Sequence, residues 1–175
     1  MSTIRDDEYV ALRKLPGKNP ESRMDVYKSE RRWQHQSFIM LGRLQLQTGS
    51  TGKVVGIEHI PQLVELAKEN TMKHHADLID SGRILFVEGD GRKGYPMEQK
   101  YDAIHVGAAA ETVPQPLIDQ LAEGGRMLIP VGKESGNQVF LQVDKQDGNV
   151  TQKVIEHVIY VPLTSKAHQL GRYDL

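Results

Sequence analysis

Short apolar runs, separated by turns and amphipathic stretches, occupy the chain from about residue 53 onward. Four runs predict strands over residues 54–57, 83–88, 101–106 and 126–131, and the runs at 54–57 and 101–106 are typical of buried strands. Helical periodicity between them predicts helices over 60–74 and 114–121. Two later segments, 137–144 and 154–161, flank a turn at Asp147-Gly148 and predict an antiparallel hairpin. The pattern predicts an α/β fold with a mostly parallel sheet that this hairpin completes.

The first 47 residues show no sustained period of either kind. Weak helical patterns cover 6–15 and 25–33, and an apolar run at 38–41 predicts a short strand. This segment holds nine Lys/Arg and six Asp/Glu, whereas the remainder holds 13 and 17, so the net charges are +3 and −4. We therefore expect 1–47 to be a divergent, solvated or poorly ordered N-terminal segment ahead of a domain over 48–175. An arm that binds nucleic acid is the less favoured interpretation.

Composition narrows the class of protein. The 175-residue chain has no cysteine, and hence no disulfide framework and no thiolate chemistry. Its formal net charge of −1 gives no argument for nucleic acid, and no apolar run reaches the length of a membrane span. Acidic residues near the N-terminus argue against a secretory signal. These features predict a cytoplasmic protein that binds neither membrane nor nucleic acid, and we expect a monomer.

Two acidic residues follow predicted strands at the edge where open α/β sheets bind ligands. Glu58 ends the 54–57 strand, where a carboxylate can accept hydrogen bonds from both hydroxyls of a ribose. Asp90 lies between Gly89 and Gly91, so the backbone can approach a flat ligand while the carboxylate accepts a hydrogen bond from an exocyclic amine. From the Gly-Asp-Gly-Arg stretch alone, an ordinary turn is the favoured interpretation.

Several blocks of sequence carry a family resemblance when taken together. They are Thr51-Gly-Lys-Val-Val-Gly-Ile-Glu-His, Gly89-Asp-Gly-Arg, Tyr101-Asp-Ala-Ile-His-Val-Gly-Ala-Ala-Ala, Gly124-Gly-Arg-Met-Leu-Ile-Pro-Val-Gly and Val158-Ile-Tyr-Val-Pro-Leu-Thr. In order and spacing they resemble the protein-L-isoaspartate O-methyltransferase family over roughly residues 48–169. The resemblance implies a Rossmann-like, S-adenosylmethionine-dependent methyltransferase sheet. It also implies methyl transfer to the carboxylate of isoaspartyl or D-aspartyl residues in damaged proteins, which begins their repair.

The resemblance also implies the residues of the site. Glu58 matches the acid that binds the ribose, and His59 is its neighbour beside the cofactor. Asp90 and Gly91 match the pair that holds the adenine, which reverses the preference for an ordinary turn. Thr164 and Gln169 match family residues that contact the cofactor after the last strand. Val161 lies in the segment that lines the peptide substrate.

Two family elements are missing from the sequence. The family carries a strand ending in Asp-Val-Gly-Ser-Gly-Ser-Gly before the Glu58 strand, and a Ser-x-Pro-His segment further upstream; neither occurs here. That strand is central in the family's sheet, so we expect this chain to lack its central first strand. Its loss leaves two edges about twice the strand spacing apart, with unpaired backbone groups. Either the 38–41 strand fills the gap, or the two edges close up, or the chain folds poorly.

The implied reaction needs no general base, because a carboxylate is already ionised near pH 7. We therefore assign no catalytic residue, and the seven histidines show no metal-ligand spacing. The main interpretation is a protein carboxyl methyltransferase that uses S-adenosylmethionine and isoaspartyl peptides. One alternative is a catalytically impaired or non-catalytic truncated variant that keeps the scaffold. A nucleotide-binding oxidoreductase is disfavoured by the absent glycine fingerprint and by the terminal hairpin.

Overall fold

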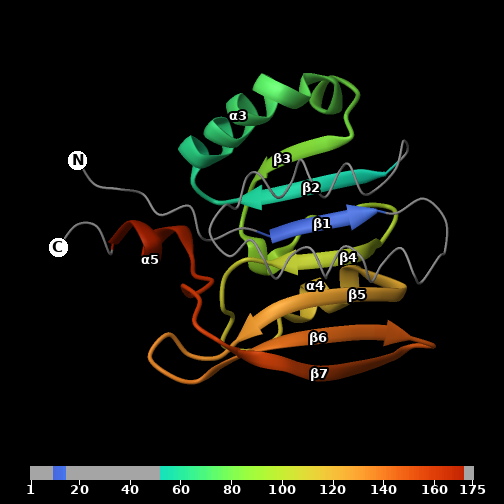
Figure 1. Cartoon of the computed structure of the whole chain (residues 1–175), viewed down its shortest axis with the longest axis vertical. Coiled ribbons are helices and arrows are strands. Elements are labelled where there is room, and N and C mark those ends of the chain that lie inside the picture. Colours follow the sequence, from blue (N-terminus) through green and yellow to red (C-terminus); the bar gives the residue numbers. More distant parts are fainter. Residues whose placement is uncertain (1–9, 15–51, 172–175) are drawn as a thin grey trace.

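The computed structural model describes residues 10–14 and 52–171, and their strands form one seven-stranded sheet in the order β3-β2-β1-β4-β5-β6-β7 (Figure 1). The strands are β1 Val10–Lys14, β2 Lys53–Glu58, β3 Ile84–Glu88, β4 Tyr101–Val106, β5 Leu121–Val131, β6 Gln138–Gln146 and β7 Asn149–Val158. The helices are α3 Pro61–Asp80, the 3₁₀ turn η1 Gly91–Lys93, α4 Gln115–Gln120 and α5 Lys166–Gly171. The predicted α/β class is confirmed.

The apolar runs form parallel pairs, although β3 lies at the edge of the sheet and Ile84 is its one buried residue. β2 pairs with β3, and β4 pairs with β5, each in parallel register. β5, β6 and β7 then form an antiparallel meander, which confirms the predicted hairpin. Its two-residue loop has positive φ at both Asp147 (53°) and Gly148 (76°), the backbone of a type I′ turn. β7 begins earlier than the sequence pattern indicates, directly after this turn.

The centre of the sheet departs from every arrangement that the sequence predicts. β1 lies between β2 and β4 and pairs with both in antiparallel register, with Leu12 opposite Val55 on one side and Ile104 on the other. A helix over 6–15 is therefore wrong at Val10–Lys14, which is extended because two strands offer it unpaired backbone groups. The gap left by the missing family strand is filled, although from 10–14; the 38–41 strand lies outside the described residues.

The direction of β1 matters for the site. Figure 1 shows its arrow opposed to those of β2 and β4. Val10 pairs with Ile57 and Val106, so the amino end of β1 reaches the edge where β2 and β4 end. The division of the chain at 47/48 stays a prediction, but five residues of the first segment belong to the sheet.

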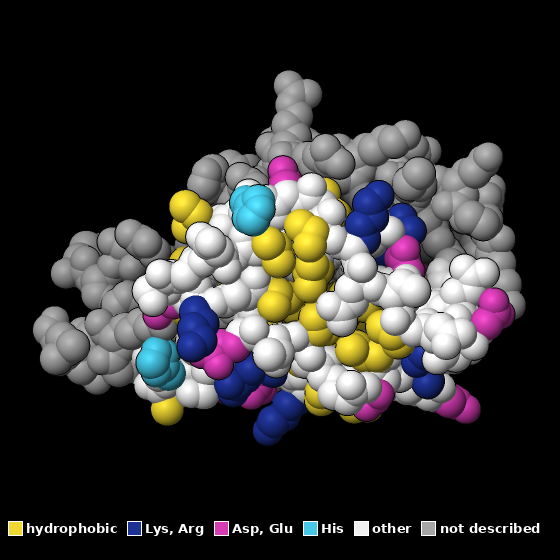
Figure 2. Space-filling model, turned by 90° about the horizontal axis from the view of Figure 1, so that it is seen from below, with side chains coloured by type: hydrophobic (Ala, Val, Ile, Leu, Met, Phe, Trp, Pro, Cys, Tyr) yellow, Lys and Arg dark blue, Asp and Glu magenta, His cyan; other side chains and the backbone are white. Residues whose placement is uncertain are grey.

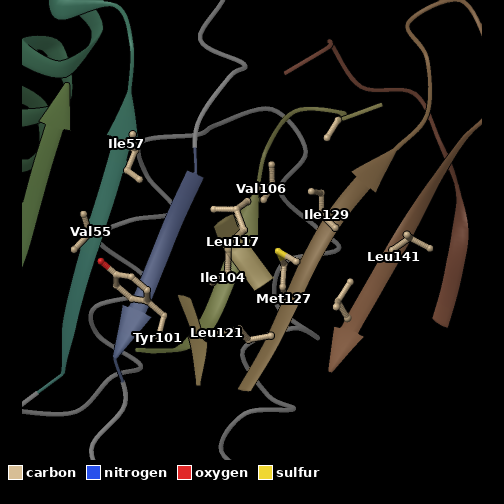
Figure 3. Close-up of a cluster of buried hydrophobic side chains, with 12 residues drawn as sticks. Val55, Ile57, Tyr101, Ile104, Val106, Leu117, Leu121, Met127, Ile129 and Leu141 are labelled. Carbon is tan, nitrogen blue, oxygen red and sulfur yellow. The ribbon is translucent and has the colours of Figure 1, made fainter. Parts of the chain in front are cut away.

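One apolar cluster holds the sheet together on both sides of β1 (Figure 3). It takes Val55 and Ile57 from β2, Ile104 and Val106 from β4, and further side chains from β5, β6 and α4. Ile104, Leu117, Leu121, Met127 and Ile129 are fully buried. Each such side chain contributes about 1.5–3 kcal/mol of transfer free energy. The cluster therefore fixes β2 relative to β4, and with them the loops that follow each strand.

Helix α3 covers the other end of the sheet, against β3 and β2. It buries Leu63, Val64, Ala67 and Leu78. A non-helical residue, His75 (φ −144°, ψ 41°), interrupts the helix just beyond the predicted 60–74 range.

Figure 2 views the molecule from the side of β6 and β7, and it shows hydrophobic side chains gathered in the middle of this face with charged side chains around them. Within residues 10–14 and 52–171, no helix is long and apolar enough to cross a membrane.

Candidate functional site

The ends of β2, β3, β4 and β5 meet along one edge of the sheet, where ligands bind in open α/β folds. The loop after β3 is joined directly to the end of β2, because the Gly89 N–H donates to the Glu58 carbonyl at 3.0 Å. This bond places the two acidic positions that the sequence predicts, Glu58 and Asp90, on neighbouring loops.

Glu58 is the last residue of β2, and only 6% of its surface is exposed. Its Oε1 accepts a hydrogen bond from the backbone N–H of Ile60 at 2.8 Å, at the start of α3. His59 is also buried, and its Nε2 lies 4.0 Å from the same oxygen. A buried carboxylate needs polar partners, so this acid is held in place at the strand end.

Asp90 begins the 3₁₀ turn η1, and its carboxylate accepts three hydrogen bonds from one residue. The Arg92 backbone N–H donates to Oδ1 at 3.0 Å, Arg92 Nε donates to Oδ1 at 2.9 Å, and Arg92 Nη2 donates to Oδ2 at 2.7 Å. These bonds from Arg92 lower the pKa of Asp90 below its ordinary value. Gly91 between them is buried. The site therefore presents an ionised carboxylate at neutral pH.

A pocket of about 530 Å³ opens at the same edge, within the range of small-molecule sites. Its walls come from the turn after β3, the loop after β4, the end of β5 and the segment before α5; among them are Arg92, Glu111, Thr112, Thr164, Ser165 and His168. Glu58, His59, Asp90 and Gly91 do not line it. Of the predicted site residues, Thr164 faces this pocket, and Asp90 adjoins it through Arg92.

Backbone hydrogen bonds shape the pocket floor. Ala109 donates to the carbonyl of Val161 at 2.7 Å and accepts from Leu163 at 2.8 Å. Ala110 donates to Pro130 at 3.0 Å and accepts from Gly132 at 2.9 Å. These bonds fix the small residues after β4 between the end of β5 and the segment that leads to α5.

The segment over 161–168 closes the edge. Thr164 Oγ1 donates to the carbonyl of Ser165 at 3.3 Å, and Ser165 Oγ accepts from the His168 N–H at 3.3 Å. Lys166 Nζ lies 2.9 Å from Glu88 Oε1, so α5 is tied to the end of β3. Gln169 lies on α5, and its side chain is outside the described part of the structure.

Comparison with known proteins identifies the family to which this chain belongs. The model of the protein-L-isoaspartate(D-aspartate) O-methyltransferase family matches residues 43–168. The chain belongs to this family. The methyltransferase of Caenorhabditis elegans is 55% identical over 129 residues, which are 74% of this chain and 57% of that protein. Protein-L-isoaspartate O-methyltransferase 2 of Arabidopsis thaliana is 45% identical over 136 residues, which are 77% of this chain and 43% of that protein.

A solved structure shares the fold. Protein-L-isoaspartate O-methyltransferase of Plasmodium falciparum, in complex with S-adenosyl-L-homocysteine, superposes with a TM-score of 0.65 at 26% identity; the match covers 71% of this chain and 60% of that one. The Rossmann-like methyltransferase fold is thereby confirmed. The chain spans about half the length of the curated relatives that it matches.

Within the methyltransferase family's frame, Glu58, His59, Asp90, Gly91 and Thr164 fall inside the matched residues, whereas Gln169 lies one residue beyond them. Arg92 and His168 also line the pocket, and neither is among the predicted site residues. Arg92 stands in the Gly-Asp-Gly-Arg motif, two residues after the acid that it binds, and that spacing was the available signal. Among the described residues, no group of three or more His, Asp or Glu could hold a metal ion.

Proposed function

We propose that this chain binds S-adenosylmethionine at the carboxyl edge of its sheet and transfers a methyl group to the carboxylate of isoaspartyl or D-aspartyl residues. The observation that carries the proposal is the bond from the Gly89 N–H to the Glu58 carbonyl. This bond joins the loop that carries Asp90 to the end of the strand that carries Glu58, which supports a site for a ligand with both a ribose and an adenine. When bound, S-adenosylmethionine supplies an electrophilic methyl group on a sulfonium.

The residues of this chain would act by binding and positioning. Glu58 accepts from the ribose hydroxyls, with His59 beside it, and Asp90 accepts from the exocyclic amine above buried Gly91. Thr164 and Gln169 add contacts from the segment before and within α5. The substrate carboxylate is already ionised, so the reaction needs alignment and no base. The segment around Val161 would line the peptide.

A second candidate function is a catalytically impaired or non-catalytic variant of the same family. It is favoured by the direction of β1, whose amino end stands at the edge where the family's glycine loop would leave a parallel strand. The sequence contains neither that loop nor the serine segment. Under this alternative the chain keeps a partial adenosine site and binds peptide or cofactor without efficient turnover.

The remaining parts of the proposal concern the cell and partners. We infer a cytoplasmic monomer that acts on damaged proteins and binds neither nucleic acid nor membrane. The absence of cysteine and the near-neutral net charge support this setting. Size-exclusion chromatography with light scattering, and cell fractionation, would test it.

Calorimetric titration of the purified chain with S-adenosylhomocysteine tests the proposed function most directly. This product of the reaction is stable and carries the same ribose and adenine. We expect saturable binding with one site per chain, and weaker binding of adenosine alone. A chain that is folded by circular dichroism but shows no heat of binding would overturn the cofactor assignment.

A further inference from the structure

The carboxylate of Asp90 is almost fully occupied by Arg92 before any ligand arrives. Oδ1 accepts from both the backbone N–H and Nε of Arg92, at 3.0 and 2.9 Å, and Oδ2 accepts from Nη2 at 2.7 Å. An ionised carboxylate offers about four acceptor positions. Three are taken, and the fourth is on Oδ2.

This arrangement fixes the orientation of the Asp90 carboxylate and also favours its charged form. A two-pronged guanidinium contact defines the plane of the carboxylate, which a single ammonium cannot do. The Asp90 side chain is 22% exposed and that of Arg92 is 41% exposed, so the pair lies at the boundary between the turn and the pocket that Arg92 lines. The acceptor left on Oδ2 has one defined direction.

We propose that Arg92 is a positioning residue for base recognition: it orients Asp90 so that a single acceptor on Oδ2 remains, which selects a nucleobase that carries an exocyclic amine. Hypoxanthine has a carbonyl in place of that amine, so it would set one acceptor against another. This inference rests on the proposed function, because it requires the adenine to lie at Asp90.

The first test needs no ligand. Carbon-detected NMR titration of Asp90 in the unaltered chain and in Arg92→Gln reports whether the pair exists in solution. We expect the pKa of Asp90 to rise toward its ordinary value in Arg92→Gln. Lys93→Gln is the matched control, since it removes an adjacent positive charge that makes no hydrogen bond to Asp90, and it should change the titration far less. An unchanged titration in Arg92→Gln would overturn the inference.

The second test measures base selectivity. Affinities for S-adenosylhomocysteine and S-inosylhomocysteine are compared by calorimetry in the unaltered chain, Arg92→Gln, Arg92→Lys, Lys93→Gln and Asp90→Asn. We expect the unaltered chain to favour the adenine compound by about 10- to 100-fold, the effect of one charge-assisted hydrogen bond. In Arg92→Gln this ratio of affinities should fall by about tenfold, because the affinity for the adenine compound alone decreases.

The other variants separate positioning from charge and from folding. Arg92→Lys keeps the charge and loses the fork, so it should restore only part of the ratio, whereas Lys93→Gln should keep all of it. Asp90→Asn should favour the inosine compound, because its amide can donate to the carbonyl. An Arg92→Gln variant that weakens both compounds equally would overturn the inference while leaving the cofactor assignment intact. If the unaltered chain binds neither compound, the proposed function fails, and the inference fails with it, whatever the NMR titration shows.

Discussion

Lys166 and Glu88 form an ion pair, Nζ to Oε1 at 2.9 Å, that joins α5 to the end of β3 across 78 positions of sequence. Both side chains are about half exposed, so the pair contributes little to global stability. Its place is more informative than its strength. Glu88 lies two residues before Asp90, and Lys166 two after Thr164, so the pair holds both sides of the candidate site together.

Lys166→Gln should therefore weaken cofactor binding without unfolding the chain. We expect a loss of two- to fivefold in affinity for S-adenosylhomocysteine, corresponding to about 0.4–1 kcal/mol for an exposed pair. The difference from the unaltered chain should shrink at high salt, since salt screens exposed charges. Lys153→Gln, at an exposed position on β7, is the matched control and should bind normally. A salt-independent loss would show that Lys166 acts otherwise.

Glu58→Ala should have a larger effect on binding. Hydrogen bonds from two ribose hydroxyls to a buried carboxylate contribute roughly 1.5–3 kcal/mol each where the acceptor is charged. Because the two together amount to at least about 3 kcal/mol, we expect affinity for S-adenosylhomocysteine to fall by about 100-fold or more. The alanine also removes the acceptor for the Ile60 N–H, so thermal unfolding is measured in parallel. Glu58→Gln, which keeps an acceptor for Ile60, separates the two effects. Measurable and unchanged affinity in Glu58→Ala would show that the ribose lies elsewhere.

The described strands differ in how far their own sequence determined them. The structures of the Val54–Ile57 run and the Asp147-Gly148 turn follow from local sequence: an uninterrupted apolar run in the first, and a two-residue loop with positive φ in the second. The structure of β1 does not follow from its local sequence. Its Arg13 and Lys14 fit a helix as well as a strand, and its conformation is set by the backbone edges of β2 and β4, which are distant in sequence. Asp90 was predicted as a site residue, but its engagement by Arg92 depends on the fold of η1.

The central place of β1 gives a direct test by substitution. Leu12→Pro removes a backbone N–H from a strand that is paired on both sides, leaving a partner carbonyl unsatisfied. We expect the free energy of unfolding in urea to fall by about 1–3 kcal/mol. Leu12→Val keeps the N–H and favours extended backbone, so it should stay close to the unaltered chain. Equal unfolding midpoints for the unaltered chain and Leu12→Pro would mean that the sheet does not need β1.

His105 on β4 predicts how stability depends on pH. Burial lowers the pKa of His105 from its ordinary value of 6.5 to about 4. Between these values the unfolded chain binds more protons than the folded one, so the free energy of unfolding decreases as the pH falls from about 6.5 to about 4. The full effect is about 3 kcal/mol. Above pH 6.5 the ring is neutral in both the folded and the unfolded chain, so this loss of stability is absent there.

Urea unfolding at several pH values measures this contribution. His105→Gln cannot titrate, so its stability should fall less steeply over that pH range than that of the unaltered chain. His74→Gln, on the exposed face of α3, should keep the steeper dependence. Parallel pH profiles for the unaltered chain and His105→Gln would show that the ring titrates normally in the folded state.

The last prediction concerns turnover, and it follows from the direction of β1. A displacement in line requires the methyl donor and the carboxylate to be held at near-contact distance, and a misplacement of about 1 Å can cost on the order of 100-fold in rate. The family holds the methionine part of the cofactor with a glycine loop after a parallel central strand, and the carboxylate with a serine segment. Here the central strand is antiparallel, and both motifs are absent from the sequence. We expect methylation of an isoaspartyl peptide at least about 100-fold slower than by a full-length family member, even where S-adenosylhomocysteine binds.

The assay for this prediction uses the purified chain, labelled S-adenosylmethionine and an isoaspartyl peptide, with the normal-aspartyl peptide as control. Rapid turnover selective for the isoaspartyl peptide would refute the expectation and would mean that another part of this chain aligns the two reactants.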